Sequence, residues 1–211
     1  MTARSLVAIF YFGLLLHSGS TAIAQPVDGD RSDEVAPVVS LEGRHSLSFG
    51  VGLLSNAQVT PGNASATGVL ASLSYAYWPH AEWGIEASAS LHESDVTGGN
   101  AASVSSLLFG ASYHPEALAF GSSFRPYLSA AGGPYIGSEA QSGFGSSAAG
   151  TQTVVGVRLG SGIDVYAWNW LRLGLRAAYH AVPAFDDAVG TIENVSGAQL
   201  SVEFGISLGS R

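Results

Sequence analysis

Ionisable side chains are few in this chain, and several of them recur at strand-like spacing toward its C-terminal end. In the stretch "LRLGLRAAYH", Arg172, Arg176 and His180 are separated by even numbers of residues, so an extended backbone places all three on one face. The same face of other alternating segments carries Glu86, His92, Arg158, Asp164 and Glu203. Guanidinium and carboxylate groups gathered in one interior would have to pair, because removing one partner of a buried ion pair costs about 3–5 kcal/mol. This lumen polar network is expected to fill and rigidify an interior; the alternative is a gated pore or a proton-sensing site.

Nucleophilic catalysis would need a serine activated by a histidine and an acid. His92 with Glu93 and Asp95, or His180 with Asp186 and Asp187, supply bases and acids. No serine is marked out among the many in the chain, so we expect no catalytic residues and no enzyme.

Carboxylates in the last long connection could bind a divalent cation, the residues being Asp186, Asp187 and Glu193. Such residues are more typical of a solvated loop face. We therefore expect neither a metal site nor a cofactor.

The elements that carry these side chains are predicted to be β-strands. Apolar residues alternate with small or polar ones, and no segment has a helical period. The eight alternating segments are 46–53, 68–77, 85–92, 106–114, 124–137, 155–165, 171–180 and 199–208. Gly132, Gly133 and Pro134 interrupt the fifth segment, where a bulge or kink is expected. Short connections alternate with longer ones, which predicts an up-and-down meander whose closure removes both exposed edges.

Composition narrows the class of protein. Charged residues make up only 11% of the 211 residues, the formal net charge is −8, and there is no cysteine. The low charge argues against an ordinary soluble enzyme. The acidic balance disfavours nucleic acid as a partner. The absence of cysteine excludes a disulfide framework and thiol catalysis.

The N-terminal region is typical of an exported protein. Arg4 precedes the apolar run "LVAIFYFGLLL", and "AIA" before Gln25 is a small-x-small cleavage site. We expect a signal peptide over residues 1–24, a flexible acidic segment over 25–43 and a barrel over 44–211.

Two kinds of barrel fit the alternation, and they differ in which face meets the core. In a soluble barrel the apolar face is inside, whereas in an outer-membrane barrel it meets lipid. The opposite face here is mostly Gly, Ser and Ala, which suits the narrow lumen of eight strands. Aromatic residues gather near the short connections, as an interfacial girdle does: Tyr75, Tyr77, Trp78, Trp83, Tyr113, Trp168 and Trp170. Near the long connections lie Tyr135, Tyr179 and Phe185, which we interpret as a second interfacial girdle. These features favour the membrane barrel.

The segments "YAYWPHAEWGIEASASL", "FRPYLSAAGGPYIG" and "LRLGLRAAYHAVPAFDDAVGTIENVSGAQLSVEFGISLG" resemble the small OmpA-like, eight-stranded outer-membrane β-barrel family. The resemblance covers the chain from about Arg44 onward. It implies an all-β, eight-stranded antiparallel up-and-down transmembrane β-barrel in the outer membrane of a Gram-negative cell. It also implies contact with outer-membrane lipid and lipopolysaccharide, and with the barrel-assembly machinery during biogenesis. Such proteins commonly end in an aromatic residue, whereas this sequence ends in "GSR".

The function expected from these observations is structural, or the display of surface loops for interaction, by a monomeric barrel with a plugged lumen. A small passive pore is the alternative. An enzyme acting on envelope lipid comes third.

Overall fold

The computed structural model describes residues 40–56, 67–94, 101–120, 123–140, 151–185 and 195–209. The chain divides into two units, Met1–Glu34 and Val35–Arg211, and every described residue belongs to the second. The predicted signal peptide and most of the predicted acidic segment lie outside the described residues. Within the described residues no helix has the length and apolar character needed to cross a membrane.

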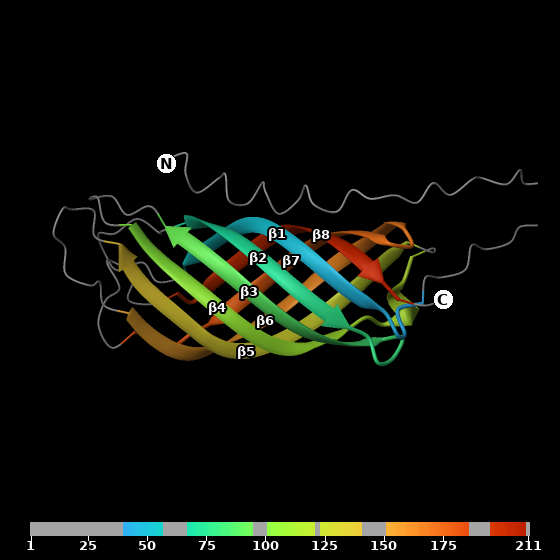
Figure 1. Ribbon diagram of the computed structural model, residues 1–211, viewed down its shortest axis with the longest axis horizontal. Helices are drawn as coiled ribbons and strands as arrows, with labels where there is room; N and C mark the ends of the chain where they lie inside the picture. Colours follow the sequence, from blue (N-terminus) through green and yellow to red (C-terminus); the bar gives the residue numbers. More distant parts are fainter. Residues whose placement is uncertain are drawn as a thin grey trace, which may run out of the picture. The chain divides into compact units, whose positions relative to one another are not determined.

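Eight strands and one short 3₁₀ helix make up the described secondary structure. Their bounds are β1 His45–Asn56, β2 Thr67–Tyr77, β3 Trp83–Ser94, β4 Ala101–Tyr113, η1 Glu116–Leu118, β5 Phe124–Ala140, β6 Thr151–Trp168, β7 Leu171–Ala181 and β8 Gly197–Leu208. All neighbouring strands are antiparallel, and β1 pairs with β8 from His45↔Leu208 to Asn56↔Gly197. The sheet is therefore a closed up-and-down barrel, which confirms the predicted fold class (Figure 1).

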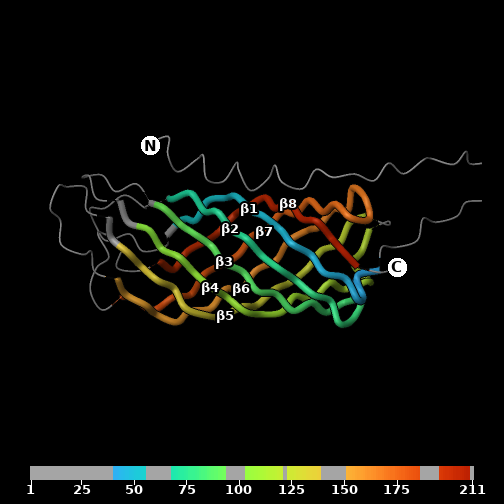
Figure 2. Tube along the Cα trace, viewed as in Figure 1, coloured from blue at the N-terminus to red at the C-terminus, as the bar shows by residue number. Residues whose placement is uncertain are grey.

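The connections sort onto the two ends of the barrel. The connections from β2 to β3, from β4 to β5 and from β6 to β7 all belong to one end of the barrel, which we call the turn end. β1, β3, β5 and β7 end, and β2, β4, β6 and β8 begin, at the other end of the barrel, which we call the loop end (Figure 2). Both ends of the strand meander, His45 and Leu208, lie at the turn end.

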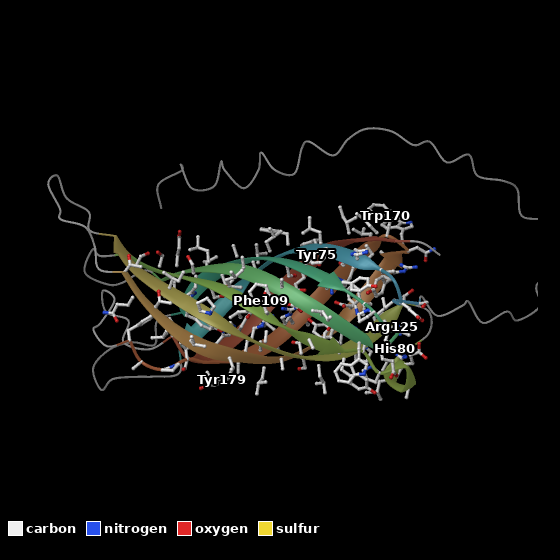
Figure 3. The ribbon with its side chains drawn as sticks, turned by 60° about the horizontal axis from the view of Figure 1, so that its bottom comes forward. Tyr75, His80, Phe109, Arg125, Trp170 and Tyr179 are labelled. Atoms are coloured by element: carbon white, nitrogen blue, oxygen red, sulfur yellow. The ribbon has the colours of Figure 1, made fainter. Side chains whose placement is uncertain are left out.

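The barrel is apolar on the outside and polar on much of the inside. β8 shows the pattern most cleanly, since Ser201 and Glu203 are buried while Val202 and Phe204 are exposed. The exposed belt includes Leu47, Phe49, Val51, Leu53, Leu73, Ile85, Leu107, Phe109, Leu128, Val157, Leu159, Ile163, Leu175, Leu200 and Ile206. Figure 3 shows Phe109 and Tyr179 on the wall of the barrel. Soluble monomers rarely expose so continuous an apolar surface, so the alternating pattern has its apolar face outward.

Two local predictions differ from the structure. The bulge expected at residues 132–134 is absent, because the pairs on either side of this segment keep one register with β4. Pro134 has no amide hydrogen to donate, so it interrupts the ladder without inserting a residue. A register shift instead falls between Tyr166 and Trp168, where β6 approaches its short turn to β7. β5 and β6 are also longer than the predicted segments 124–137 and 155–165, with 17 and 18 residues.

Candidate functional site in the barrel lumen

The centre of the lumen holds a carboxylate that two arginines share. Glu86 on β3 accepts a hydrogen bond on Oε1 from Nη2 of Arg158 at 2.7 Å. It also accepts bonds from Nη1 and Nη2 of Arg176, at 3.0 and 3.2 Å. Because β3 and β7 stand on opposite sides of the closed strand order, the Glu86–Arg176 pair crosses the lumen. This two-point contact is the geometry that makes Arg–carboxylate pairs strong.

A second set of ion pairs lies nearer the turn end. Nη1 of Arg172 on β7 donates to Oδ2 of Asp164 on β6 at 2.7 Å. Its Nη2 lies 3.4 Å from Oε2 of Glu203 on β8 and also donates to Oγ of Ser48 on β1. One guanidinium therefore ties together β1, β6, β7 and β8.

Arg176 joins the two sets. Its Nε lies 2.9 Å from Oε1 of Glu203 and 3.1 Å from the hydroxyl of Tyr127, and its guanidinium carbon lies 5.7 Å from the centre of the Tyr127 ring. The result is one continuous chain of contacts, which we call the ionic layer: Arg158, Glu86, Arg176, Glu203, Arg172 and Asp164. Six of the eight residues of the predicted lumen polar network thus meet in the structure.

A seventh buried ion lies at the turn end and was not among the predicted site residues. Arg125, on β5, is 1% exposed and shares the inward face with Tyr127 (Figure 3). The alternation of side chains along the strand was enough to predict that Arg125 faces inward. Among the described residues, four arginines are buried, Arg125 included, and three carboxylates are buried, those of Glu86, Asp164 and Glu203. With all of them ionised, their net charge is 4 − 3 = +1.

The turn end of the lumen is capped by an apolar cluster, which we call the turn-end cap: Leu41, Ala76, Trp78 and Tyr166. The backbone N–H of Arg44 donates to Leu41 O at 3.0 Å, and Gly43 between them has φ +73°. Glycine suits that conformation because it has no Cβ. Gly43 and Trp78 are joined by a further backbone bond of 2.8 Å. Leu41, which belongs to the segment predicted as a flexible lead-in, is therefore buried at the turn end of the lumen, whereas Glu42 and Gly43 are exposed.

Trp78 is the one member of the predicted interfacial aromatics that the structure places inside. It is 1% exposed and lies 5.8 Å, ring to ring, from His114. His114 follows β4, and its Nε2 lies 3.1 Å from Oγ of Ser112. Burial lowers the pKa of His114 to about 3, and the charges of Arg172 and Arg125 lower it further. This ring is therefore a neutral part of the turn-end packing.

The other predicted interfacial aromatics lie on the outer side at the turn end. Their partially or fully exposed rings are Tyr75, Tyr77, Trp83, Tyr113, Trp168 and Trp170. Trp83 lies 4.8 Å from Tyr113 and Trp168 lies 5.9 Å from Trp170, measured between ring centres. Figure 3 shows Trp170 at this end of the barrel.

The loop end of the lumen is apolar, which the sequence interpretation did not anticipate. A cluster that we call the loop-end cluster consists of Val104, Leu108, Ala131, Tyr135, Val182, Phe185 and Val195. Of the three aromatics expected to face lipid near this end, Tyr179 is exposed, whereas Tyr135 and Phe185 are buried in this cluster. The interfacial interpretation is wrong for Tyr135, whose aromatic character was given more weight than its inward register, and for Phe185, which lies in the connection beyond β7 and is buried there.

The two remaining predicted lumen residues, His92 and His180, lie near the loop-end cluster and outside the ionic layer. His180 is fully engaged, since Nδ1 lies 2.9 Å from the hydroxyl of Tyr135 and Nε2 lies 2.7 Å from Oε1 of Gln199. His92 is buried on the inward face of β3, while its neighbour Glu93 is exposed on the outward face. Within the described residues, neither histidine meets a serine and an acid together. The other acids considered for catalysis, Asp95, Asp186 and Asp187, lie outside the described residues.

The described part of the chain contains no group of three or more His, Asp or Glu side chains placed to hold a metal ion. The carboxylates considered for a divalent cation, Asp186, Asp187 and Glu193, lie outside it.

Comparison with known proteins identifies the fold. No family model and no curated protein matches the sequence. Among solved structures, Neisserial surface protein A is similar with a TM-score of 0.62 and 16% identity, over 78% of this chain and 97% of that one. The outer membrane protein OprG from Pseudomonas aeruginosa has a TM-score of 0.58 and 14% identity, over 82% and 100%. Ail, the attachment invasion locus protein of Yersinia pestis, has a TM-score of 0.54 and 14% identity, over 79% and 99%. The fold is therefore that of the eight-stranded outer-membrane barrels.

Proposed function

We propose that this protein is an outer-membrane barrel whose lumen is closed to ion flow, and that its role is structural or lies in surface interaction through the loop end. The apolar outer belt supports the membrane location, because a belt of this kind matches the lipid-facing surface of such barrels. The similar solved structures are outer-membrane and surface proteins. Export through the predicted signal peptide belongs to the same proposal.

The cross-lumen contact at Glu86 carries the closed-lumen part of the proposal. A passive pore needs a continuous water path between its two ends. Here the turn-end cap, the ionic layer and the loop-end cluster follow one another along the lumen. An ion would have to separate Glu86 from Arg158 and Arg176, and breaking buried pairs of this kind is costly.

Conductance in a planar bilayer tests this part directly. The wild-type protein is expected to insert without opening a conducting path. A stable conductance from protein that also shows the heat-modifiable gel migration of a folded barrel would contradict the closed lumen and favour the passive pore. Cell fractionation tests the membrane part independently, because a soluble periplasmic protein would contradict it.

Charge limits the partners that the loop end could recognise. Residues 57–66, 95–100, 141–150 and 186–194 contain no Lys or Arg, and their charged residues are Asp95, Asp186, Asp187 and Glu193. Ail has been solved in complex with the heparin analogue sucrose octasulfate, a polyanion. Basic residues are what attract polyanions, so we propose for this chain a neutral or cationic surface partner and no sulfated sugar.

Catalysis on envelope lipid is not part of the proposal. His180 is hydrogen-bonded to Tyr135 and Gln199. His92 faces the lumen, whereas the neighbouring acid Glu93 faces outward. The similar structures are described as surface and attachment proteins.

A further inference from the structure

A small cavity lies in the loop end of the lumen, between the ionic layer and the loop-end cluster. Its volume is about 10 Å³, close to the smallest space that holds one water molecule. Leu54, Leu70 and Val104 give it apolar walls, and His92, Tyr135 and His180 contribute polar groups. Apolar walls with a few convergent polar groups are typical of small-molecule sites, and a space this small admits such a molecule only if a side chain is displaced.

His92 is the polar group that the fold leaves incompletely satisfied. It is 2% exposed, and neither ring nitrogen makes a hydrogen bond of ordinary geometry with the described part of the chain. The backbone of Val69 interacts with the ring, but one backbone group serves only one of two nitrogens. His180 on the opposite wall has a partner for each nitrogen. Buried polar groups nearly always have a partner, so His92 points to a ligand that supplies one.

Val195, from the connection between β7 and β8, lines the cavity and packs in the loop-end cluster beside Phe185. Phe185 is 5% exposed and belongs to the same cluster as Val104 and Tyr135, which line the cavity. It lies four residues beyond the end of β7, so its ring is supplied by a connection and not by the barrel wall. The hydroxyl of Ser196 holds the base of this connection, since it accepts from Val182 N at 2.9 Å and donates to Val182 O at 2.8 Å.

We propose that the loop end of the lumen is a binding pocket for a small neutral aromatic molecule with one hydrogen-bonding group, which replaces the Phe185 ring and bonds to His92. The aromatic part follows from the Phe185 ring, which packs in the same cluster as the cavity-lining residues Val104 and Tyr135, and the polar group follows from His92. The ligand is neutral because the described lining offers no free charge: Arg158, the register partner of His180, is bonded to Glu86. The ionic layer lies on the side toward the turn end, so the ligand enters and leaves from the loop end.

Ligand-observed fluorine NMR on the full chain in phospholipid nanodiscs tests this pocket, with 4-fluorophenol and fluorobenzene as probes. Wild-type protein is expected to bind 4-fluorophenol saturably. Phe185→Ala is expected to bind it about tenfold more tightly, because the ring no longer has to be displaced. The control is Phe109→Ala, which removes a phenyl group that is 60% exposed on the outer face of β4 and should leave binding unchanged.

The role of His92 is tested by His92→Phe in the Phe185→Ala background. This change should abolish a preference of about tenfold for 4-fluorophenol over fluorobenzene, because only the phenol can hydrogen-bond to His92. Phe185→Leu replaces Phe185→Ala if the latter does not migrate as a folded barrel. The proposal is overturned if wild-type protein shows no saturable binding, or if Phe109→Ala changes affinity as much as the Phe185 variant does. Binding here is independent of the proposed closed lumen, which bilayer conductance tests separately.

Discussion

The substitution Glu86→Gln should destabilise the barrel more than any other single change of similar size in the lumen. The glutamine keeps the shape of the side chain and removes the charge that Arg158 and Arg176 share. Arg176 retains Glu203, whereas no other carboxylate is paired with Arg158 among the described residues. The formal charge of the buried described residues rises from 4 − 3 = +1 to 4 − 2 = +2. Leaving one member of a buried ion pair uncompensated costs about 3–5 kcal/mol, and we expect a loss in this range.

Ser88→Ala is the matched control for this prediction. Ser88 is the next inward residue on β3, is buried, and has a hydroxyl without a hydrogen-bond partner in the described structure. Its replacement should change the free energy of unfolding by less than about 1 kcal/mol. Arg158→Gln in the Glu86→Gln background lowers the charge again to 3 − 2 = +1, and part of the loss should be recovered.

Urea unfolding in phospholipid vesicles, followed by tryptophan fluorescence and gel migration, measures these differences. The reasoning would be refuted by a Glu86→Gln variant whose unfolding free energy lies within about 1 kcal/mol of that of Ser88→Ala. Such a result would mean that water reaches Glu86 and screens the lost charge.

Three further predictions concern the wall and the turn end. Val202→Arg, at the exposed middle of β8, should cost about 2–4 kcal/mol in vesicles if this face meets lipid, whereas no loss would contradict the membrane orientation. Leu41→Ala should cost about 2–5 kcal/mol by opening a cavity in the turn-end cap, and equal urea midpoints for variant and wild type would show that residue 41 does not seal the mouth. The pKa of His114 is about 3 in the folded protein against an ordinary value of 6.5, so between these pH values the unfolded chain binds more protons and the unfolding free energy falls as pH is lowered. His114→Phe should lose this part of the pH dependence, and a pH profile of unfolding that matches that of wild type would count against the buried neutral ring.

Strand parity alone predicted most of the barrel, and the errors came where residue type was weighed above it. Because side chains alternate strictly across a strand, the inward positions of Glu86, Arg176 and Glu203 were predictable, and so was the order of their strands. Trp78 and Tyr135 occupy inward positions by the same rule, but their rings were assigned to lipid because aromatic residues are common at membrane interfaces. Arg125 was overlooked because it is the only charged residue of its segment, "FRPYLSAAGGPYIG", and lies at the start of that segment beside Pro126.

The cross-lumen partnership of Glu86 was less accessible to sequence reasoning. Parity places a side chain inside but says nothing of its height along the barrel, which depends on the shear of the closed sheet. Leu41 was missed for a different reason: a single residue before the first strand carries no period, and only the turn at Gly43 directs it into the mouth.

The apolar ends of the lumen and its ionic layer depend on one another. Charges attract strongly, and their isolation is costly, only where water is excluded. In the closed lumen that we propose, Leu41 and Trp78 exclude water at the turn end, and Phe185 and its neighbours exclude it at the loop end. In an open eight-stranded lumen the same arginines and carboxylates would be hydrated, and their pairing would contribute little. The inward-facing apolar residues therefore allow the ion pairs to stabilise the barrel, although the interior of a membrane barrel is usually expected to be polar.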